Sequence, residues 1–527
     1  MTSIVRRFTT VFALLLLVGP PRVHAQEADR PNIVFIFSDD HATQAVGAYG
    51  GRLAGLDPTP HLDRLAEEGM LFRNAFVTNS ICAPSRAVIL TGKHSHLNGV
   101  ETNRTGDSLN AAQETFPELL GDSGYQTAMI GKWHLKSAPT GFDYWEVLPG
   151  QGAYYNPSFR TEDGTTRYTG YTTDIITDRA LNWLENGRND NEPFLLMYQH
   201  KAPHRNWQPG PDHLTTYDDQ EIPMPRSLFY NYTHLSRAAV MQEMEISTDL
   251  WWGWDLKLPV NPDQPADSMD GYRRFHQRLT PTQKRAWEGA YRPKNEQFYR
   301  QYRNGALQER DLVRWKYQRY LKDYLRTIAS LDDNIGRLLQ HLEDRGLADN
   351  TIVIYSSDQG FFLGEKGWYD KRWMYDESMR MPLIVRWPGV VAPGSDSDAL
   401  VQNLDFAQTL LDVAGADAPD AMQGRSLVPL LRGSAPSDWR EAVYYHYYEF
   451  PRPHHVVPHE GIRTQRYKLI HYYTIDEWEL IDLRLDPDEL TNRYGHPDYA
   501  DVTAQLEQQL DALRTQYGVT DADYGAR

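Results

Sequence analysis

The strongest constraint on the fold is a continuous apolar run, Ile33 to Phe37, that ends abruptly in Ser38-Asp39-Asp40. Such a run predicts a strand buried on both faces, as in a parallel sheet. Further strands are predicted at 70–77, 125–130, 193–198 and 351–355, and helices at 59–69, 85–90, 115–122 and, with the clearest apolar periodicity, 312–344. This alternation predicts an α/β sandwich with a large, mostly parallel mixed sheet flanked by helices.

Polar residues follow several of these predicted strands directly. They are Asp39 and Asp40, Lys132 and His134, His204, and Asp358 and Gln359. In open α/β sheets, ligands bind at the edge formed by the carboxyl ends of the strands. We therefore expect these residues, although far apart in sequence, to meet at one edge of the sheet.

The first 25 residues have the pattern of a secretory signal peptide. Arg6 and Arg7 form a basic start, residues 11–18 form an apolar core, and a small-residue cleavage site ends at Ala25. The apolar core is shorter than the roughly 20 residues that a membrane span needs, so an uncleaved anchor is the weaker alternative. We expect a secreted or periplasmic protein without a membrane span.

About 500 residues exceed what one hydrophobic core organises, so two domains are expected. The pattern loosens over 216–310, around the cluster Trp251-Trp252-Gly253-Trp254, which we interpret as an insertion at the functional edge. Alternating stretches at 442–448, 467–473 and 478–483 predict a small antiparallel sheet, and 502–517 predicts a closing helix. We expect a catalytic domain over 26–435 and a C-terminal α+β subdomain over 436–527.

Acidic side chains outnumber basic ones by 71 to 54. This balance disfavours nucleic acid as a partner, because nucleic acids bind basic surfaces. An acidic surface also repels a long polyanion. The composition therefore favours a pocket for one small anionic group over a long basic groove.

Asp39, Asp40, Asp358 and Gln359 together offer only oxygen ligands. Such a set suits a hard cation such as Ca2+ or Mg2+, whereas zinc is disfavoured because its usual Cys and His ligands are not grouped here. Taken alone, Asp39-Asp40 favours a solvated turn. The presence of Asp358 at the end of a second predicted strand favours the metal site instead.

The remaining polar residues at these positions are cationic or basic: Arg86, Lys132, His134, His204 and Lys371. Beside a divalent cation, one arginine and two lysines form a site for a compact tetrahedral anion. The two histidines are able to exchange protons near neutral pH. Each residue has a plain structural alternative, and it is their joint placement that predicts an active site.

The chain has a single cysteine, which opens the pentapeptide Cys82-Ala83-Pro84-Ser85-Arg86. One thiol cannot form an internal disulfide. Pro84 suits the first turn of a helix, so Cys82 is expected at a helix N-terminus, where backbone N–H groups favour an anion. The alternative for a lone cysteine is a small buried apolar residue.

These residues resemble the signatures of the type I, formylglycine-dependent sulfatases of the alkaline phosphatase-like superfamily. The resemblance covers nearly all of the chain beyond the signal peptide. The matching motifs are Cys82-Ala83-Pro84-Ser85-Arg86 with Leu90-Thr91-Gly92-Lys93, Gly131-Lys132-Trp133-His134, Ala202-Pro203-His204, Ser357-Asp358-Gln359-Gly360, and Gly364-Glu365-Lys366-Gly367-Trp368 through Lys371.

The resemblance implies that a maturation enzyme, which reads Pro84 and Arg86, oxidises Cys82 to formylglycine (3-oxoalanine). The hydrate of this aldehyde is the nucleophile in the family. The metal would be calcium, with magnesium as the less favoured alternative, and residue 82 would complete its ligands. Those ligands are implied at Asp39, Asp40, Asp358 and Gln359, the last of which is often Asn in relatives.

The resemblance also implies a role for each basic residue. Arg86 and Lys132 would stabilise the hydrate, and Lys371 would share in binding the sulfate oxygens. His204, with Lys371, would contact the substrate and protonate the departing sugar oxygen. His134 would remove a proton from the second hydroxyl, which releases sulfate and restores the aldehyde.

The substrate implied is a sulfated carbohydrate. Stretches at 141–145, 150–152 and 154–157 resemble bacterial carbohydrate sulfatases, including those that act on 6-sulfated N-acetylglucosamine of glycosaminoglycans, and related enzymes act on ulvan. His454, His455 and His459 either line the substrate pocket or lie on a polar loop. The alternatives are a phosphonate or phosphate monoester hydrolase of the same superfamily and an inactive calcium-dependent sugar-binding protein.

Overall fold

The computed structural model describes residues 30–104, 106–263 and 269–525. The signal peptide predicted at 1–25 lies outside these ranges. Within them, no helix combines the length and the apolar content needed to cross a bilayer.

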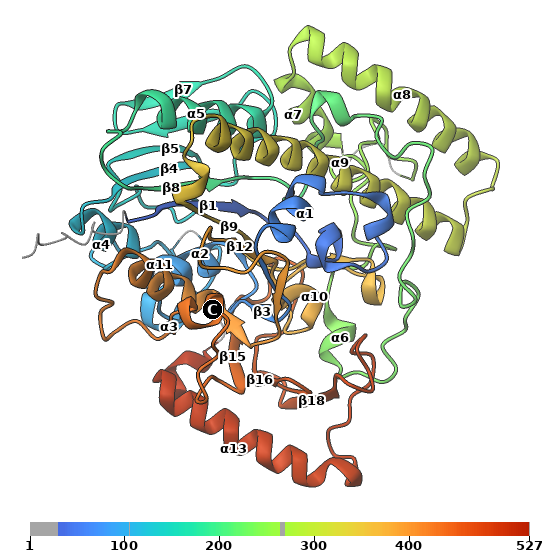
Figure 1. The fold of residues 1–527 in the computed structure, drawn as a ribbon. Helices are drawn as coiled ribbons and strands as arrows, with labels where there is room; N and C mark the ends of the chain where they lie inside the picture. The colour runs from blue at the N-terminus through green and yellow to red at the C-terminus, as the bar shows by residue number, and fades with distance from the viewer. Residues whose placement is uncertain (1–29, 105, 264–268, 526–527) are drawn as a thin grey trace, which may run out of the picture.

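The described residues form a central ten-stranded sheet, in which five neighbouring strands run parallel (Figure 1). Its order is β13 (Ser395–Ser397), β2 (Met70–Phe72), β12 (Leu383–Arg386), β9 (Thr351–Ser357), β1 (Asn32–Ser38), β8 (Phe194–Gln199), β4 (Gln126–Lys132), β5 (Tyr144–Leu148), β6 (Ser158–Thr161), β7 (Gly164–Arg167). The parallel strands are β9 through β5 in this order, and antiparallel pairs flank them on both sides. The predicted mostly parallel mixed sheet is confirmed.

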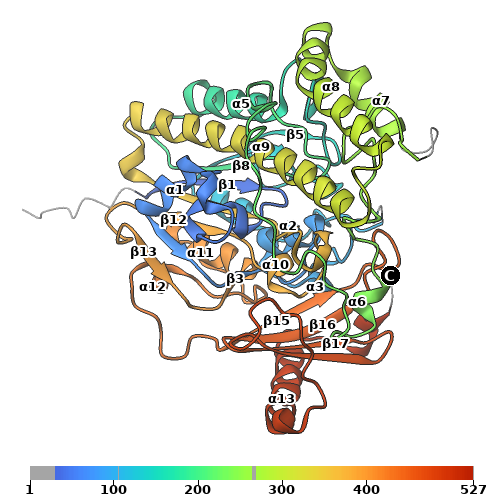
Figure 2. The ribbon, with the colours of Figure 1, turned by 90° about the vertical axis from the view of Figure 1, so that its right-hand side faces the viewer.

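Helices cover both faces of this sheet, as Figures 1 and 2 show. Val34 and Ile36 of β1 point into one core, shared with helices α1 (Pro60–Glu67), α5 (Thr172–Asn186) and α9 (Glu309–Asp344). Ile33, Phe35 and Phe37 point into the other, shared with α2 (Cys82–Thr91), α4 (Phe116–Asp122) and α11 (Phe406–Ala414). Because both faces of β1 are buried, its sequence is continuously apolar rather than alternating.

The strand predicted at 70–77 is wrong as a single element. It divides into β2, in the central sheet, and β3 (Ala75–Phe76), which pairs with β14 (Val401–Gln402) in a separate sheet. The polar pair between them breaks the run. Arg73 forms an ion pair with Asp396 at 2.8 Å, and Asn74 donates to the carbonyl of Asp398 at 2.9 Å.

The region 216–310 contains helices that the sequence did not predict: α6 (Ala238–Met241), α7 (Met269–Arg278) and α8 (Pro281–Arg303). Thr280 and Gln283 cap the start of α8 reciprocally. The helix buries Trp287, Tyr291 and Phe298 along one side. Pro293 in its interior obscured the pattern, because proline normally ends or kinks a helix.

The C-terminal part forms the small antiparallel sheet expected, with one more strand than predicted. Its order is β15 (Ala442–Tyr447), β16 (His459–Thr464), β17 (Tyr467–Tyr472), β18 (Glu477–Asp482). Helix α13 (Ala500–Tyr517) covers one face, where Leu506 and Leu510 join the same core as the sheet, and the opposite face packs on the main body (Figure 2). Strand β16 was missed because it has no apolar alternation; it includes the buried polar residues His459 and Glu460.

Candidate active site

The predicted carboxylates converge at the carboxyl ends of β1 and β9. Asp358 donates its backbone N–H to the carbonyl of Ser38 at 3.3 Å, and Asp40 donates its N–H to Asp358 Oδ1 at 3.0 Å. Asp39, Asp40 and Asp358 are fully buried, and each offers a carboxylate oxygen within 4.8 Å of the others. Three acidic groups thus share one small enclosed space.

Cys82 lies beside these carboxylates, at the first residue of α2, where the sequence predicted a helix N-terminus. Its Sγ atom, a carboxylate oxygen of Asp39 and a ring nitrogen of His204 all lie within 4.8 Å of one another. The side chain is fully buried. Burial raises the pKa of the Cys82 thiol, and Asp39 adds to this, so the unmodified group stays protonated near neutral pH.

Arg86 joins α2 to the strand ends. Its Nε and Nη2 atoms donate to Asp358 Oδ2 at 3.1 and 3.0 Å. Its Nη1 atom donates to the carbonyl of Lys132 at 2.9 Å and to Gln199 Oε1 at 2.7 Å. The guanidinium is thereby fixed in one orientation next to the cysteine.

Two lysines pair with the remaining carboxylates. Lys132 Nζ contacts Asp39, and Lys371 Nζ donates to both oxygens of Asp40 at 2.6 Å. Both lysines are at most 3% exposed at their side chains. Together with Arg86, they give each buried carboxylate one cationic partner.

The carboxylates nevertheless remain crowded. Burial raises the pKa of Asp40 to about 6, with a contribution from Asp39, and raises that of Asp358 to about 8, again with Asp39 contributing. Burial also opposes ionisation of Asp39, but Lys132, His204 and Arg86 hold its pKa well below the usual range. Like charges this close favour a further cation among them.

The donor set fits a hard metal ion. Among the described side chains, Asp39 Oδ1 and Gln359 Oε1 are buried oxygens without a hydrogen-bond partner. The Gln359 amide nitrogen instead contacts Asp40 and donates to Asp358 Oδ1 at 2.8 Å. Half a turn of the amide about its last bond would bring its oxygen to the carboxylates and complete an all-oxygen set.

The two predicted histidines flank this centre. His204 Nε2 lies 3.7 Å from Asp40 Oδ2, and the hydroxyl of Tyr154 donates to the His204 carbonyl at 2.6 Å. His134 follows β4 and is 9% exposed, and its Nδ1 has no hydrogen-bond partner within the described chain. Burial lowers the pKa of both imidazoles well below the usual value. Both rings are therefore neutral in this state.

Two residues beside Lys371 extend the site and were not predicted. Asp370 Oδ1 accepts from the backbone N–H of Lys371 and from Arg372 Nη1, each at 2.8 Å. His454 Nε2 lies 3.3 Å from Asp370 Oδ2. The immediate proximity of Asp370 and Arg372 to Lys371 is the signal that would have found them.

The three C-terminal histidines separate in space. Only His454 contacts the group around Asp370. His459 is fully buried and accepts from the backbone N–H of Met374 at 3.1 Å, while His455 packs against the ring of Phe450.

Lys201 is a further charged residue that sequence reasoning missed. It is 5% exposed, and its ammonium lies 4.8 Å from the ring centroid of Tyr154. Burial, together with the positive charge of Lys132, lowers its pKa to about 7. Its position in the segment His200-Lys201-Ala202-Pro203-His204 was the available signal.

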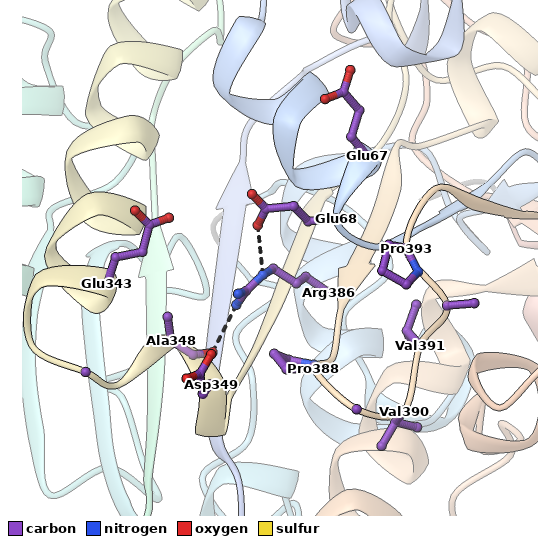
Figure 3. A pocket seen from close by; sticks show the side chains of 13 residues that line it. Glu67, Glu68, Glu343, Ala348, Asp349, Arg386, Pro388, Val390, Val391 and Pro393 are labelled. Carbon is purple, nitrogen blue, oxygen red and sulfur yellow. Dashed lines mark hydrogen bonds and ion pairs between the residues drawn. The ribbon is translucent and has the colours of Figure 1, made fainter.

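A separate pocket lies at the opposite edge of the sheet, beside the start of β9 (Figure 3). Arg386 occupies its centre, paired with Glu68 at 2.9 Å and donating to the carbonyl of Ala348 at 3.0 Å. The predicted site residues follow the carboxyl ends of strands β1 and β9, so this pocket is distinct from the cysteine and its carboxylates.

Comparison with known proteins agrees with the motif pattern. The model of the Sulfatase family matches residues 31–416, and that of the N-sulphoglucosamine sulphohydrolase C-terminal family matches residues 364–516. The chain is 48% identical over 517 residues to N-acetylglucosamine-6-O-sulfatase of Bacteroides thetaiotaomicron. This alignment covers 97% of this chain and 91% of that protein. It is 29% identical over 445 residues to human N-acetylglucosamine-6-sulfatase, covering 79% of this chain and 67% of the relative.

A solved structure of a protein in complex with its substrate, D-glucosamine-2-N,6-O-disulfate, superposes with a TM-score of 0.89 at 48% identity. The match covers 94% of this chain and 99% of that one. The family match extends over well more than half of the sequence. The chain is therefore a member of the sulfatase family, enzymes that hydrolyse sulfate esters.

Proposed function

We propose that the protein removes an O-sulfate group from a carbohydrate, and that oxidised Cys82 provides the nucleophile. The observation that supports this most directly is the convergence of Cys82, three carboxylates and three cationic side chains in one buried space. The preferred substrate is a glucosamine residue sulfated at O6. Relatives named for N-acetylglucosamine-6-sulfate, and the solved relative with its 6-O-sulfated substrate, support this choice.

Charge balance favours an anionic substrate. A bound metal ion would keep all three carboxylates ionised, and they would then cancel the three cationic side chains, so that a divalent ion leaves two positive charges in the site. A sulfate monoester carries one negative charge, and a deprotonated aldehyde hydrate carries a second. The loaded site would then be neutral, which is the arrangement that burial favours.

Asp39, Asp40, Asp358 and the Gln359 amide oxygen would hold the metal ion, with the oxidised side chain at position 82 beside them. When bound, a calcium ion would supply positive charge next to the sulfate oxygens. Magnesium is the alternative, and the all-oxygen donors fit both.

In the first chemical step, one hydroxyl of the hydrated residue 82 loses its proton to solvent and attacks sulfur as its oxyanion. Arg86 and Lys132 stabilise that oxyanion, and Lys371 neutralises charge on the sulfate oxygens. The bond from sulfur to the sugar oxygen breaks, and His204 gives this oxygen a proton. A bound sulfate group beside His204 favours the protonated imidazole that this transfer requires.

In the second step, His134 removes the proton from the remaining hydroxyl of residue 82. The carbonyl re-forms, the bond from its carbon to the sulfate oxygen breaks, and sulfate leaves. Water then hydrates the aldehyde for the next turnover. An ordinary serine would need water to attack the sulfated enzyme instead, so the aldehyde hydrate simplifies this step.

Mass spectrometry of the peptide around Cys82, combined with turnover measurements, tests the proposal. Protein from its native host should carry the mass of the aldehyde or its hydrate at position 82. It should release sulfate from 6-sulfated N-acetylglucosamine far faster than phosphate from 4-nitrophenyl phosphate. An unmodified thiol in active protein, or a preference for phosphate or phosphonate esters, would contradict it.

We also propose three features of the whole chain. First, residues 1–25 direct export and are removed. Second, a maturation enzyme oxidises Cys82, and third, the domains extend over 26–435 and 436–527. The basic and apolar pattern of the N-terminus supports the first proposal. The pentapeptide at Cys82 supports the second. N-terminal sequencing of protein from the culture medium or periplasm should begin after Ala25.

A further inference from the structure

Trp251 stands out among the residues that the proposed chemistry leaves unused. It is 59% exposed, unusual for so large an apolar side chain, and it belongs to the insertion at 216–310. Single exposed apolar residues are common on protein surfaces, so the exposure of Trp251 does not by itself indicate a binding site. The contacts that hold Trp251 in place connect it to the active site.

Asp255 fixes Trp251 to the segment that contains the proposed proton donor. Its buried carboxylate accepts from the backbone N–H of Trp251 at 2.8 Å. The same carboxylate accepts from Arg205 Nε and Nη2 at 2.7 and 2.6 Å. Arg205 directly follows His204, so one carboxylate positions both the tryptophan and the neighbour of the catalytic histidine.

Further hydrogen bonds make this connection rigid. Lys257 Nζ donates to the carbonyls of Asn206 and Asp255, both at 2.7 Å. Asn206 Nδ2 donates to the carbonyl of Trp254 at 3.3 Å. The turn from Trp251 closes on itself, because Asp255 donates its N–H to the Trp251 carbonyl at 2.9 Å. The indole is therefore presented on a preorganised turn, which lowers the entropy cost of binding.

The surroundings of Arg205 connect Trp251 to the residues beside Lys371. The guanidinium carbon of Arg205 lies 5.6 Å from the ring centroid of Trp251 and 4.9 Å from that of Tyr369. Its Nη1 lies 3.5 Å from His454 Nε2, which in turn lies near Asp370. A chain of contacts thus runs from Trp251 through Arg205 and His454 to Asp370, which accepts a hydrogen bond from the backbone of Lys371.

We propose that Trp251 stacks against the pyranose ring next to the sulfated sugar and so makes the enzyme prefer oligosaccharides. This inference rests on the proposed function and names the part of the substrate that lies outside the sulfate pocket. A flat indole contacts the C–H face of a sugar without needing charge. Such recognition suits a protein with a net charge of −17, whose surface would repel a polyanionic chain.

The test compares two substrates that share a 6-sulfated terminal glucosamine, one a monosaccharide and the other a tetrasaccharide. Trp251→Ala should lower the ratio of kcat/KM for the tetrasaccharide to that for the monosaccharide by about fivefold or more, in line with the energy of one aromatic contact. Trp251→Phe should keep most of the ratio. Val260→Ala, a change at a 48% exposed residue of the same insertion, should leave it unchanged.

Equal losses on both substrates, or no loss on either, would overturn the inference. Titration calorimetry with the tetrasaccharide, carried out in the Cys82→Ala background so that no substrate is consumed, gives a second readout that does not depend on turnover. The dissociation constant should rise in Trp251→Ala by a factor similar to the fall in the kinetic ratio. Wild-type protein that binds the tetrasaccharide but releases no sulfate would contradict the proposed function and leave the stacking result to stand on affinity alone.

Discussion

Two buried charge clusters in this molecule have the same number of acids and bases but differ in how completely their atoms are paired. The active-site cluster comprises Asp39, Asp40 and Asp358 with Arg86, Lys132 and Lys371. The junction cluster, between the main body and the small sheet, comprises Asp376, Glu377 and Glu489 with Lys366, Arg463 and Lys468.

The junction cluster is closed. Lys468 Nζ bridges Asp376 and Glu489 at 2.7 and 2.5 Å, and Arg463 reaches Asp376 at 3.1 Å. Lys366 Nζ donates to the two oxygens of Glu377 at 3.1 and 3.3 Å. Among the described residues, no charged nitrogen or oxygen of this cluster is buried without a hydrogen-bond partner.

The active-site cluster is open by contrast. Asp39 Oδ1 lacks a hydrogen-bond partner, and so does the neighbouring Gln359 Oε1. Unpaired buried oxygens are costly, and these two lie beside the carboxylates of Asp40 and Asp358, where a metal ion would complete them. The comparison indicates that buried charge joins two parts of the fold at the junction, whereas at the strand ends it prepares a binding site.

The largest expected effect comes from removing the proposed nucleophile. Cys82→Ala should lower kcat/KM for a sulfated sugar by at least about 10⁴-fold, because the variant has no group that can attack sulfur. The unfolding temperature should stay within a few degrees, since one small side chain is lost. Steady-state kinetics and thermal unfolding on the same preparation measure both, and a variant that keeps 1% of wild-type turnover would exclude Cys82 as nucleophile.

Removal of the metal should lower both activity and stability, because the active-site cluster has buried oxygens that need a cation. Chelation should lower activity by about 10²- to 10³-fold and lower the unfolding temperature, and added Ca2+ should restore both. Asp358→Asn should abolish the Ca2+-dependent rise in unfolding temperature. Glu489→Gln, the matched change in the junction cluster, should destabilise the protein equally with and without Ca2+. Unfolding that is indifferent to chelator in the wild type would refute the metal assignment.

His204→Ala should distinguish substrates by their leaving groups. Turnover of a sulfated sugar should fall by about 10²-fold or more, because a sugar alkoxide needs a proton to depart. Turnover of 4-nitrophenyl sulfate should fall by less than about tenfold, since nitrophenolate leaves without help. Parallel measurements of kcat on the two esters decide the matter, and similar losses on both would remove His204 from the donor role.

The smallest effect on catalysis should follow a break in the closed cluster. Lys468→Met leaves two buried carboxylates without their shared cation and should cost about 3–5 kcal/mol of unfolding free energy. Turnover per folded molecule should change by less than twofold. Lys468→Arg should lose much less stability. If Lys468→Met lost activity while remaining as stable as the wild type, the two clusters would not be separate in function.

The sequence allowed the strand ends to be predicted because burial on both faces leaves a local pattern, as in the run before Asp39. The rule that parallel strands end at one edge then brought Asp39 and Asp358 together. No local pattern predicted α8, whose interior contains Pro293. Arg205 and Asp255 were missed because their pairing depends on how a long insertion returns to the sheet.

The complete enclosure of Cys82 bears on how the protein is made. Under the proposed maturation, a second enzyme would have to bind the segment around this thiol before the chain folds, because a folded site that admits one sulfate group is too enclosed to admit the active site of another protein. Oxidation and folding would then compete in time. A molecule that folds first would keep an unmodified thiol, so the active fraction of a preparation would be set during biosynthesis.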